Sequence, residues 1–275
     1  MTKYLVTGGA GSLGKHLLAH LLETQSSKVI VYDNNENAVA WLNRFNSHPN
    51  LKLVLGDVND TQKLDYAMEG VDVVVHLAYA KHVDLCESDP LFGLKINISG
   101  TMNTITCALK ADVEKFLFVS SDKAVYPISI YGKSKSLCES IVLRSYHYRN
   151  SRRTKFCVVR PPNYAGSNCS VMTIWLEQKR RCEPLTVTDS RMTRYFMSFK
   201  DMTTLIIQCV EDMQGGEVFV PTKVKHSSIM EMAHNISEKI EIIGLREGER
   251  LQAFLLTDEE KSRAEKKESY WLIKS

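Results

Sequence analysis

The sequence predicts an α/β fold with a doubly wound, mostly parallel sheet and a smaller C-terminal lobe. Short β-branched segments are apolar on both faces, helical segments alternate with them, and a glycine-rich turn directly follows the first strand. Such strands are typical of a parallel sheet covered on both sides, and right-handed crossovers wind that sheet in two directions. We assign residues 1–165 to the sheet domain and 166–275 to the lobe, with some lobe segments returning to the sheet.

The elements follow in order. The first strand covers Tyr4–Thr7, and the helix after the glycines has leucines on one face at helical spacing. Further strands are predicted at 28–33, 51–55, 71–75, 116–119 and 156–159. After about Pro161 the rhythm changes, with helices predicted at 170–182, 200–213 and 227–239 and strands at 217–220 and 240–243. Residues 258–267 are predicted to form a charged helical or frayed tail.

Composition excludes several classes of protein. A net charge of +3 is too small to indicate a nucleic-acid partner. The 7 cysteines are scattered and form no C-x-x-C pair, which argues against a disulfide framework or a metal site and is typical of a reducing compartment. No apolar run approaches the roughly 20 residues that span a bilayer. We predict a cytoplasmic protein that binds no metal, membrane or nucleic acid.

The segment Thr7–Gly14 carries three glycines, Gly8, Gly11 and Gly14, spaced G-x-x-G-x-x-G between a strand and a helix. Glycines there allow a tight turn, bring backbone N–H groups to a pyrophosphate and let the helix pack closely on the strand. The helix N-terminus adds partial positive charge. The segment therefore predicts a dinucleotide site, to which we also assign Ser12 and Leu13.

Two acidic residues extend this site. Asp33 ends the second strand about 20 residues after Gly14, where a carboxylate accepts hydrogen bonds from the adenosine ribose. Its charge would repel a 2′-phosphate, which favours NAD over NADP. Asp57 and Val58 follow the third strand, and Asp57 is a candidate partner of the adenine amino group. An ordinary turn is the alternative interpretation of that position.

A candidate redox centre follows the fifth strand. Ser121, Asp122 and Lys123 come first, and the motif Tyr131-Gly-Lys-Ser-Lys135 comes next. Tyr131 and Lys135 are four residues apart and share one helix face. A tyrosine has an ordinary pKa of about 10. The neighbouring ammonium and a positively charged nicotinamide are predicted to lower that pKa, so that Tyr131 acts as a base. Lys135 is also expected to bond the nicotinamide ribose.

These motifs resemble the extended short-chain dehydrogenase/reductase family, and more closely its inverting UDP-N-acetylglucosamine 4,6-dehydratases. The resemblance runs from about Lys3 to Leu251 and includes Thr7–Gly14, His76–Val83, Ser121–Ala124, Tyr131–Lys135, Val158–Arg160, Asn163, Gly166-Ser167, Arg191–Tyr195, Gly215–Pro221 and Ile243–Glu249. The family usually has Ser-Arg where this chain has Asp33-Asn34, which suits NADP. The choice between NAD and NADP therefore stays open.

The resemblance implies a Rossmann domain at 1–165 that binds NAD(P)+ and a lobe at 166–275 that binds a UDP-sugar. Tyr131 would take the C4 hydroxyl proton as C4 is oxidised, and Lys123 would remove the C5 proton. A protonated Asp122 would help the C6 hydroxyl to leave as water. Hydride returning to C6 would give a 4-keto-6-deoxy sugar with inverted C5, and the regenerated cofactor would stay tightly bound.

Further roles follow from the same resemblance. Ser121 would hold the C4 oxygen, although a strand-end serine also caps backbone. Ala78 is assigned to the cofactor, Lys81 and His82 to the sugar pocket, and three residues to the UDP moiety: Asn163, Arg194 and Arg246. Each of these could instead be structural. Related enzymes self-associate, so a homo-oligomer is expected.

Two other functions fit the same motifs. A nucleotide-sugar 4-epimerase or reductase would use Tyr131 and Lys135 but would not need Asp122 or Lys123. A cofactor-binding regulatory protein would retain the fold without turnover.

Overall fold

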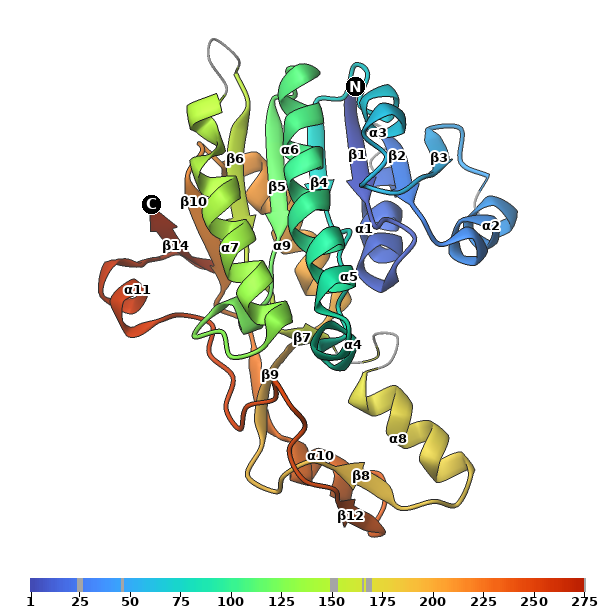
Figure 1. Cartoon of the computed structure of the whole chain (residues 1–275), viewed down its shortest axis with the longest axis vertical. Helices are drawn as coiled ribbons and strands as arrows, with labels where there is room; N and C mark the ends of the chain where they lie inside the picture. The colour runs from blue at the N-terminus through green and yellow to red at the C-terminus, as the bar shows by residue number, and fades with distance from the viewer. Residues whose placement is uncertain (24–26, 46, 149–152, 165, 167–169, 275) are drawn as a thin grey trace.

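A computed structural model of the chain describes residues 1–23, 27–45, 47–148, 153–164, 166 and 170–274, so Ser167 of the motifs above lies outside it. Within these residues the main body is a nine-stranded sheet between two layers of helices (Figure 1). Its strands lie side by side in the order β13 (Glu265–Lys266), β14 (Tyr270–Lys274), β10 (Glu217–Pro221), β6 (Lys155–Val159), β5 (Lys115–Val119), β4 (Val73–His76), β1 (Thr2–Thr7), β2 (Ser27–Asp33) and β3 (Leu51–Leu55).

The strands from β10 to β3 run parallel, while β14 pairs antiparallel with β10 and β13 pairs antiparallel with β14. The strand order reverses direction between β1 and β4, as in a doubly wound sheet. The predicted α/β fold class is therefore confirmed. The sequence predicted a charged helical or frayed tail at 258–267, and Asp258–Arg263 is a helix. Strand β13 within that stretch and strand β14 after it were not predicted.

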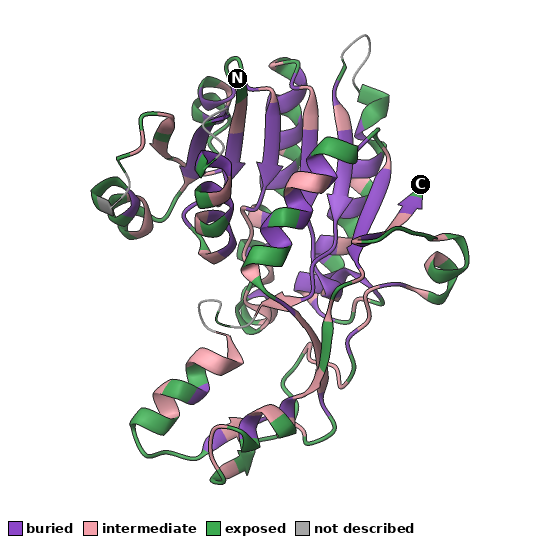
Figure 2. Ribbon diagram, turned by 180° about the vertical axis from the view of Figure 1, so that it is seen from behind, coloured by how far each residue is buried: buried purple, intermediate pink, exposed green. Residues whose placement is uncertain are grey.

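Helices cover both faces of the sheet. On one face lie α1 (Ser12–Glu23), α2 (Glu36–Phe45) and α9 (Phe199–Asp212), and on the other lie α3 (Thr61–Ala67), α6 (Gly100–Lys110) and α7 (Ile130–Arg144). Strand residues alternate between two apolar cores: Val6 packs with the α1 leucines, while Leu5 packs on the opposite side. The buried strands stand out against the exposed outer faces of the helices (Figure 2). Burial on both faces explains the uninterrupted apolar strand sequences.

A smaller lobe lies beyond the carboxyl ends of the parallel strands (Figure 1). It contains the three-stranded sheet β11 (Lys225–Ser228), β9 (Thr193–Met197) and β7 (Asn163–Tyr164) and the pair β12 (Ile240–Ile242) and β8 (Leu185–Val187). Helices α8 (Val171–Arg180) and α10 (Ile229–His234) complete it around buried Trp175. Because β10, β13 and β14 belong to the large sheet, the chain after residue 166 contributes to both bodies.

Short elements connect these bodies. Helices α4 (Val83–Ser88) and α5 (Pro90–Leu94) follow β4, and a π-helical turn, Lys95–Ser99, leads into α6. A 3₁₀ turn, Asp122–Ala124, follows β5, and a second one, Ser145–Tyr148, follows α7. Near the end, α11 (Asp258–Arg263) begins with a capping box in which Thr257 and Glu260 bond each other's backbone N–H groups.

A buried ion triad attaches this last segment to the sheet. Arg160, directly after β6, donates to both carboxylate oxygens of Glu139 on α7, at 3.1 and 2.7 Å. It also donates to both oxygens of Glu260 and to the Leu255 carbonyl. Only 3 % of Arg160 is exposed, so these two carboxylates compensate a charge that has little access to water.

Candidate active site

The glycine turn is forced by its surroundings. Gly8 has φ +68°, and a Cβ built on it would lie 2.8 Å from the Ala78 nitrogen. A Cβ on Gly14 would lie 2.4 Å from the Gly9 carbonyl oxygen. Only glycine has both the left-handed backbone freedom and the small size that Gly8 needs. This close approach places the turn between the carboxyl ends of β1 and β4, at the start of α1.

The turn borders a cavity of about 630 Å³, here called the glycine-loop cavity. It lies within the range usual for small-molecule sites. Its wall includes every residue assigned to the cofactor except Tyr131 and Lys135: Gly8, Gly11, Ser12, Leu13, Gly14, Asp33, Asp57, Val58 and Ala78.

The two carboxylates of this cavity are held by neighbouring groups. Asp33 accepts hydrogen bonds from the backbone N–H groups of Ala10 and Asn35, both at 2.9 Å. Asp57 accepts from the Asn34 amide at 3.2 Å and from the Asn59 backbone at 2.8 Å. Burial alone would raise the pKa of Asp57, but these hydrogen bonds lower it below its ordinary value. Asp33 therefore fixes the glycine turn, and Asp57 carries a negative charge.

A second cavity, of about 350 Å³, opens between the 3₁₀ turn after β5 and the lobe. We call it the Lys123 cavity. Of the residues assigned to chemistry or substrate, its wall includes Ser121, Asp122, Lys123, Tyr131, Lys81, His82, Asn163, Arg194 and Arg246. Tyr79, Lys81, His82 and Tyr164 line both cavities, so the two spaces meet at these side chains.

An ion pair lies in this wall. The Lys123 ammonium donates to Asp122 Oδ1 at 3.0 Å and to Asn163 Oδ1 at 3.2 Å, and the Ser121 hydroxyl donates to Asp122 Oδ1 at 2.9 Å. Burial would raise the pKa of Asp122. The charge and hydrogen bond of Lys123, with the help of Ser121 and Arg250, lower it instead. In the free protein, direct pairing with Lys123 therefore favours the carboxylate form of Asp122, whereas the acid role that the resemblance implies for Asp122 needs the protonated form.

Tyr131 and Lys135 lie on α7, which begins where the Ser129 hydroxyl caps the Gly132 N–H at 2.9 Å. Tyr131 reaches the Lys123 cavity, but Lys135 lines neither cavity. Its ammonium donates to the Val119 carbonyl at 2.9 Å and lies 3.8 Å from the centre of the Tyr79 ring. Tyr131 and Lys135 therefore share one face of α7, and the Lys135 ammonium is hydrogen-bonded to the last residue of β5.

The pKa values of this pair differ from the sequence expectation. Burial and the neighbouring Tyr79 raise the pKa of Tyr131 well above 10.0, although a hydrogen bond with Ser121 acts to lower it. Burial lowers the pKa of Lys135 to about 7. In the free protein, Lys135 therefore does not give Tyr131 a low pKa. The physical reason is that desolvation disfavours both the phenolate and the ammonium.

The residues assigned to the UDP moiety have different surroundings. Arg194 donates to the backbone carbonyls of Thr193, Arg250 and Leu251, so its guanidinium ties β9 to a neighbouring segment. Asn163 bonds Lys123 and the Tyr195 carbonyl. Arg246 is exposed, lines the cavity, and has no side-chain hydrogen bond among the described residues. Of the three, Arg246 has the guanidinium most available to an anion.

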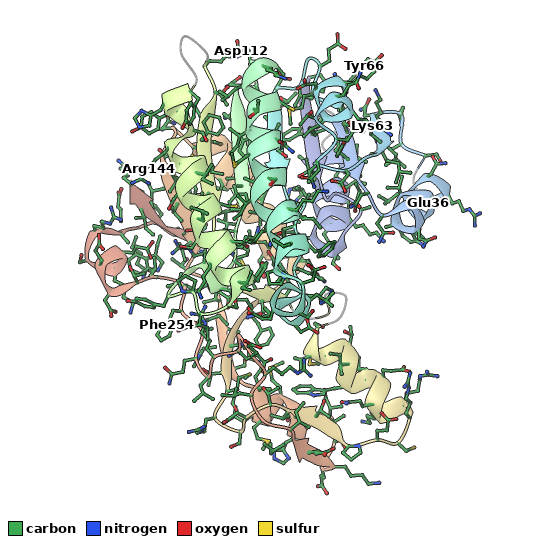
Figure 3. The ribbon with its side chains drawn as sticks, viewed as in Figure 1. Glu36, Lys63, Tyr66, Asp112, Arg144 and Phe254 are labelled. Atoms are coloured by element: carbon green, nitrogen blue, oxygen red, sulfur yellow. The ribbon has the colours of Figure 1, made fainter. Side chains whose placement is uncertain are left out.

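Sequence reasoning missed Arg250 as a site residue. Its guanidinium donates to the carbonyls of Asp122 and Val125, at 2.8 and 2.5 Å, and so positions the turn that carries the ion pair. On the same segment, Phe254 (labelled in Figure 3) meets the Tyr126 ring edge-on, with centroids 5.5 Å apart. The available signal was only that Arg250 follows the Ile243–Glu249 motif directly.

Tyr79 and Tyr164 were also missed as site residues. Tyr79 lies within the His76–Val83 motif, and its ring centre is 6.1 Å from that of Tyr131. Tyr164 directly follows Asn163, and its hydroxyl oxygen is buried without a hydrogen-bond partner among the described residues. A tyrosine in a strand or loop is usually a packing residue, and neither the motif around Tyr79 nor the neighbouring Asn163 indicates that these two tyrosines line a cavity.

Comparison with known proteins identifies the family. The family of polysaccharide biosynthesis proteins matches residues 4–275. An inverting UDP-N-acetylglucosamine 4,6-dehydratase of Campylobacter jejuni is 33% identical over 98% of this chain and 81% of its own length. A UDP-glucose 4-epimerase of Rickettsia canadensis is 32% identical over 98% of this chain and 82% of its own. An uncharacterized membrane protein of Methanocaldococcus jannaschii is 35% identical over 98% of this chain and 84% of its own.

Among the part of the chain that the structure describes, no helix is both long enough and apolar enough to cross a membrane.

Solved structures agree on the fold. Pen from Bacillus thuringiensis has a TM-score of 0.95 at 31% identity, and the match covers 100% of this chain and 88% of the Pen chain. The dTDP-glucose 4,6-dehydratase DesIV of Streptomyces venezuelae, solved with NAD bound, has a TM-score of 0.85 at 23% identity and covers 95% of this chain and 90% of its own. The chain therefore belongs to the family of polysaccharide biosynthesis proteins and has the fold of the extended short-chain dehydrogenases/reductases.

Proposed function

We propose that this protein is a nucleotide-sugar 4,6-dehydratase that acts on UDP-N-acetylglucosamine and inverts C5. Membership of its family supports an enzyme that modifies nucleotide sugars, and the inverting dehydratase of Campylobacter jejuni supports this substrate. The observation that carries the proposal is the Asp122–Lys123 ion pair beside Tyr131 in the wall of one cavity. Oxidation at C4 needs one base and a hydride acceptor, whereas elimination of water needs in addition a base at C5 and an acid at C6.

The glycine-loop cavity fits a nicotinamide dinucleotide. Gly8 and Gly14 leave no room for a Cβ, as a turn that brings backbone N–H groups to a pyrophosphate requires. When bound, the nicotinamide supplies the hydride acceptor for C4 and the hydride donor for C6. Asp33 would meet the adenosine ribose, and its carboxylate favours NAD over NADP. Asp57 and Val58 would contact the adenine end.

The chain's own residues move the protons. Tyr131 accepts the C4 hydroxyl proton as its phenolate, which the positive charge of a bound nicotinamide would favour against the burial that raises its pKa in the free protein. Ser121, hydrogen-bonded to Tyr131, holds the C4 oxygen in register. The free protein contains the pair as carboxylate and ammonium. Transfer of one proton along the 3.0 Å contact makes Lys123 a neutral amine and Asp122 a neutral acid. Lys123 then takes the C5 proton, while Asp122 gives its proton to the C6 hydroxyl, which leaves as water. Lys123 is then an ammonium and Asp122 a carboxylate again.

The substrate's other end faces the lobe. Arg246 is the candidate for the diphosphate, because its guanidinium is exposed at the cavity. Arg194 and Asn163 act as positioning residues, since Arg194 holds the 250–251 backbone and Asn163 holds Lys123. Lys81 and His82 lie where the two cavities meet and are assigned to the sugar. Self-association stays a prediction.

The test is incubation with UDP-N-acetylglucosamine in deuterated water, followed by mass spectrometry and NMR of the product. We expect loss of one water, a methyl group at C6, deuterium at C5 and inversion there. An isomer of unchanged mass would instead identify a 4-epimerase. That second candidate is favoured by the Rickettsia canadensis relative, and it would leave the Asp122–Lys123 pair without a chemical role. Bound cofactor without any turnover would indicate a regulatory protein.

A further inference from the structure

Tyr164 has a feature that the proposed chemistry does not use. Its hydroxyl oxygen is buried, yet no described residue forms a hydrogen bond with it. A buried polar group without a partner is costly, and such groups in folded proteins usually meet a ligand or water. Because Tyr164 lines both cavities, the missing partner is to be sought in a bound molecule.

The position of the ring is fixed by an aromatic stack. Tyr164 stacks on Phe199 with centroids 5.0 Å apart and an interplanar angle of 20°. Phe199 stacks on His16 of α1 with centroids 4.4 Å apart. Phe199 lines the glycine-loop cavity and not the Lys123 cavity, and His16 bonds the Ser12 carbonyl at the start of α1. The stack therefore holds Tyr164 on the side of the glycine turn.

Tyr164 lies close to the reacting groups. Tyr164 is near enough to Tyr131 for its charge to raise the pKa of that phenol, and Tyr79 and Asp122 in turn raise the pKa of Tyr164. Burial is the larger cause for Tyr164, so the phenol stays protonated and can both donate and accept a hydrogen bond. Tyr164 lines both cavities and therefore lies at their junction.

We propose that the Tyr164 hydroxyl binds the nicotinamide end of the cofactor, through its carboxamide. A carboxamide offers both a donor and an acceptor, and the aromatic stack places Tyr164 with the glycine-loop cavity rather than with the lobe. This inference rests on the proposed function, because it presupposes a nicotinamide dinucleotide. It assigns Tyr164 as a cofactor-positioning residue in addition to Tyr131 and Lys135.

The test measures binding in the absence of turnover. The full-length protein, cleared of nucleotide, is titrated with NAD+ and with ADP-ribose, which lacks the nicotinamide, and in parallel with NADP+ and 2′-phospho-ADP-ribose. Tyr164→Phe keeps the ring and its stack but removes the hydroxyl. We expect this variant to bind the dinucleotide about 2- to 10-fold more weakly, because one hydrogen bond is lost. Its affinity for the nicotinamide-free analogue should be unchanged. Tyr148→Phe, at an exposed position outside both cavities, is the matched control.

Several results would overturn the inference. Equal affinity of the variant and the wild type for the dinucleotide would remove Tyr164 from the cofactor site. If the variant lost affinity only for UDP-N-acetylglucosamine, the Tyr164 hydroxyl would be assigned to the sugar site instead. A lower melting temperature of the free variant would show an ordinary structural hydroxyl, since removing an unpartnered one should leave stability unchanged or higher. If the wild type binds none of the four nucleotides, the proposed function fails together with this inference.

Discussion

The two cavities share four side chains but are built from very different stretches of chain. The glycine-loop cavity is formed mainly by the ends of β1, β2, β3 and β4 and the turns that follow them. The Lys123 cavity combines turns after β4 and β5 with α8, β8, β9 and the 246–250 segment of the lobe. The first depends on backbone shape and the second on side chains brought together over long sequence distances. Substitutions in one cavity should therefore have effects that can be measured separately from those of substitutions in the other.

The largest expected effect is in the Lys123 cavity. Lys123→Ala removes the base proposed for C5 and leaves Asp122 buried without its cation. We expect turnover to fall about 10²- to 10⁴-fold, as for loss of a general base. Exchange of the C5 proton for deuterium should fall with it, while affinity for the dinucleotide stays the same. Lys133→Ala, an exposed position on the same helix as Tyr131, is the control. Undiminished exchange in Lys123→Ala would contradict the assignment.

The next effect belongs to the glycine-loop cavity. Gly8→Ala and Gly244→Ala both place a side chain at positive φ, +68° and +84°, but only Gly8 has backbone atoms at 2.8 Å from the new Cβ. We expect Gly244→Ala to lower the free energy of unfolding by about 1 kcal/mol, from the left-handed backbone alone. Gly8→Ala should lower it by about 3 kcal/mol or more, because the neighbouring strand end must also move.

Urea unfolding and dinucleotide titration of both glycine variants check this prediction. Only Gly8→Ala should also lose dinucleotide affinity. If both variants lose the same stability and bind the dinucleotide equally, the close approach of the turn to Ala78 has no energetic importance.

The smallest effect concerns Lys135, whose ammonium lies over the ring of Tyr79, a residue that lines both cavities. Lys135 has a pKa of about 7 in the folded protein, lowered by burial, against an ordinary value of 10.5. Between these values the unfolded chain binds one more proton than the folded one, so stability should rise with pH. From pH 7 to 8 this group should add about 1 kcal/mol to the free energy of unfolding. Urea unfolding of Lys135→Met should show no such rise in the free energy of unfolding. If the variant and the wild type had the same pH dependence of stability, the low pKa of Lys135 would be disproved.

The same contrast explains how much the sequence could predict. The residues of the dinucleotide site directly follow successive parallel strands. Because the carboxyl ends of such strands lie at one edge of the sheet, the sequence order alone predicts that these residues lie close together. In the lobe, the sequence could identify guanidinium groups but not their partners, so Arg194 was assigned to a phosphate although three backbone carbonyls bind it. Strand β14 was missed because its pairing with β10 is antiparallel and distant in sequence.

The pKa values of the free protein could not be predicted from the sequence, for a related reason. Helical spacing correctly places Tyr131 and Lys135 on neighbouring turns, but it does not give the depth at which a side chain lies. The Lys135 ammonium is buried between the rings of Tyr79 and Phe118, which no spacing rule reveals. Burial then decides the protonation of both groups more strongly than their mutual charge. For Asp122, in contrast, Lys123, Ser121 and Arg250 together outweigh burial.

The Arg160 triad gives the C-terminal segment an influence on the active site that sequence distance conceals. Removing a partner from a buried ion pair usually costs about 3–5 kcal/mol. A chain shortened to end before Glu260 would leave Arg160 with one carboxylate, directly before the stretch Pro161–Asn163 that lines the Lys123 cavity. Such a truncation would therefore perturb the position of Asn163, and with it Lys123, although no described residue after Arg250 lines either cavity.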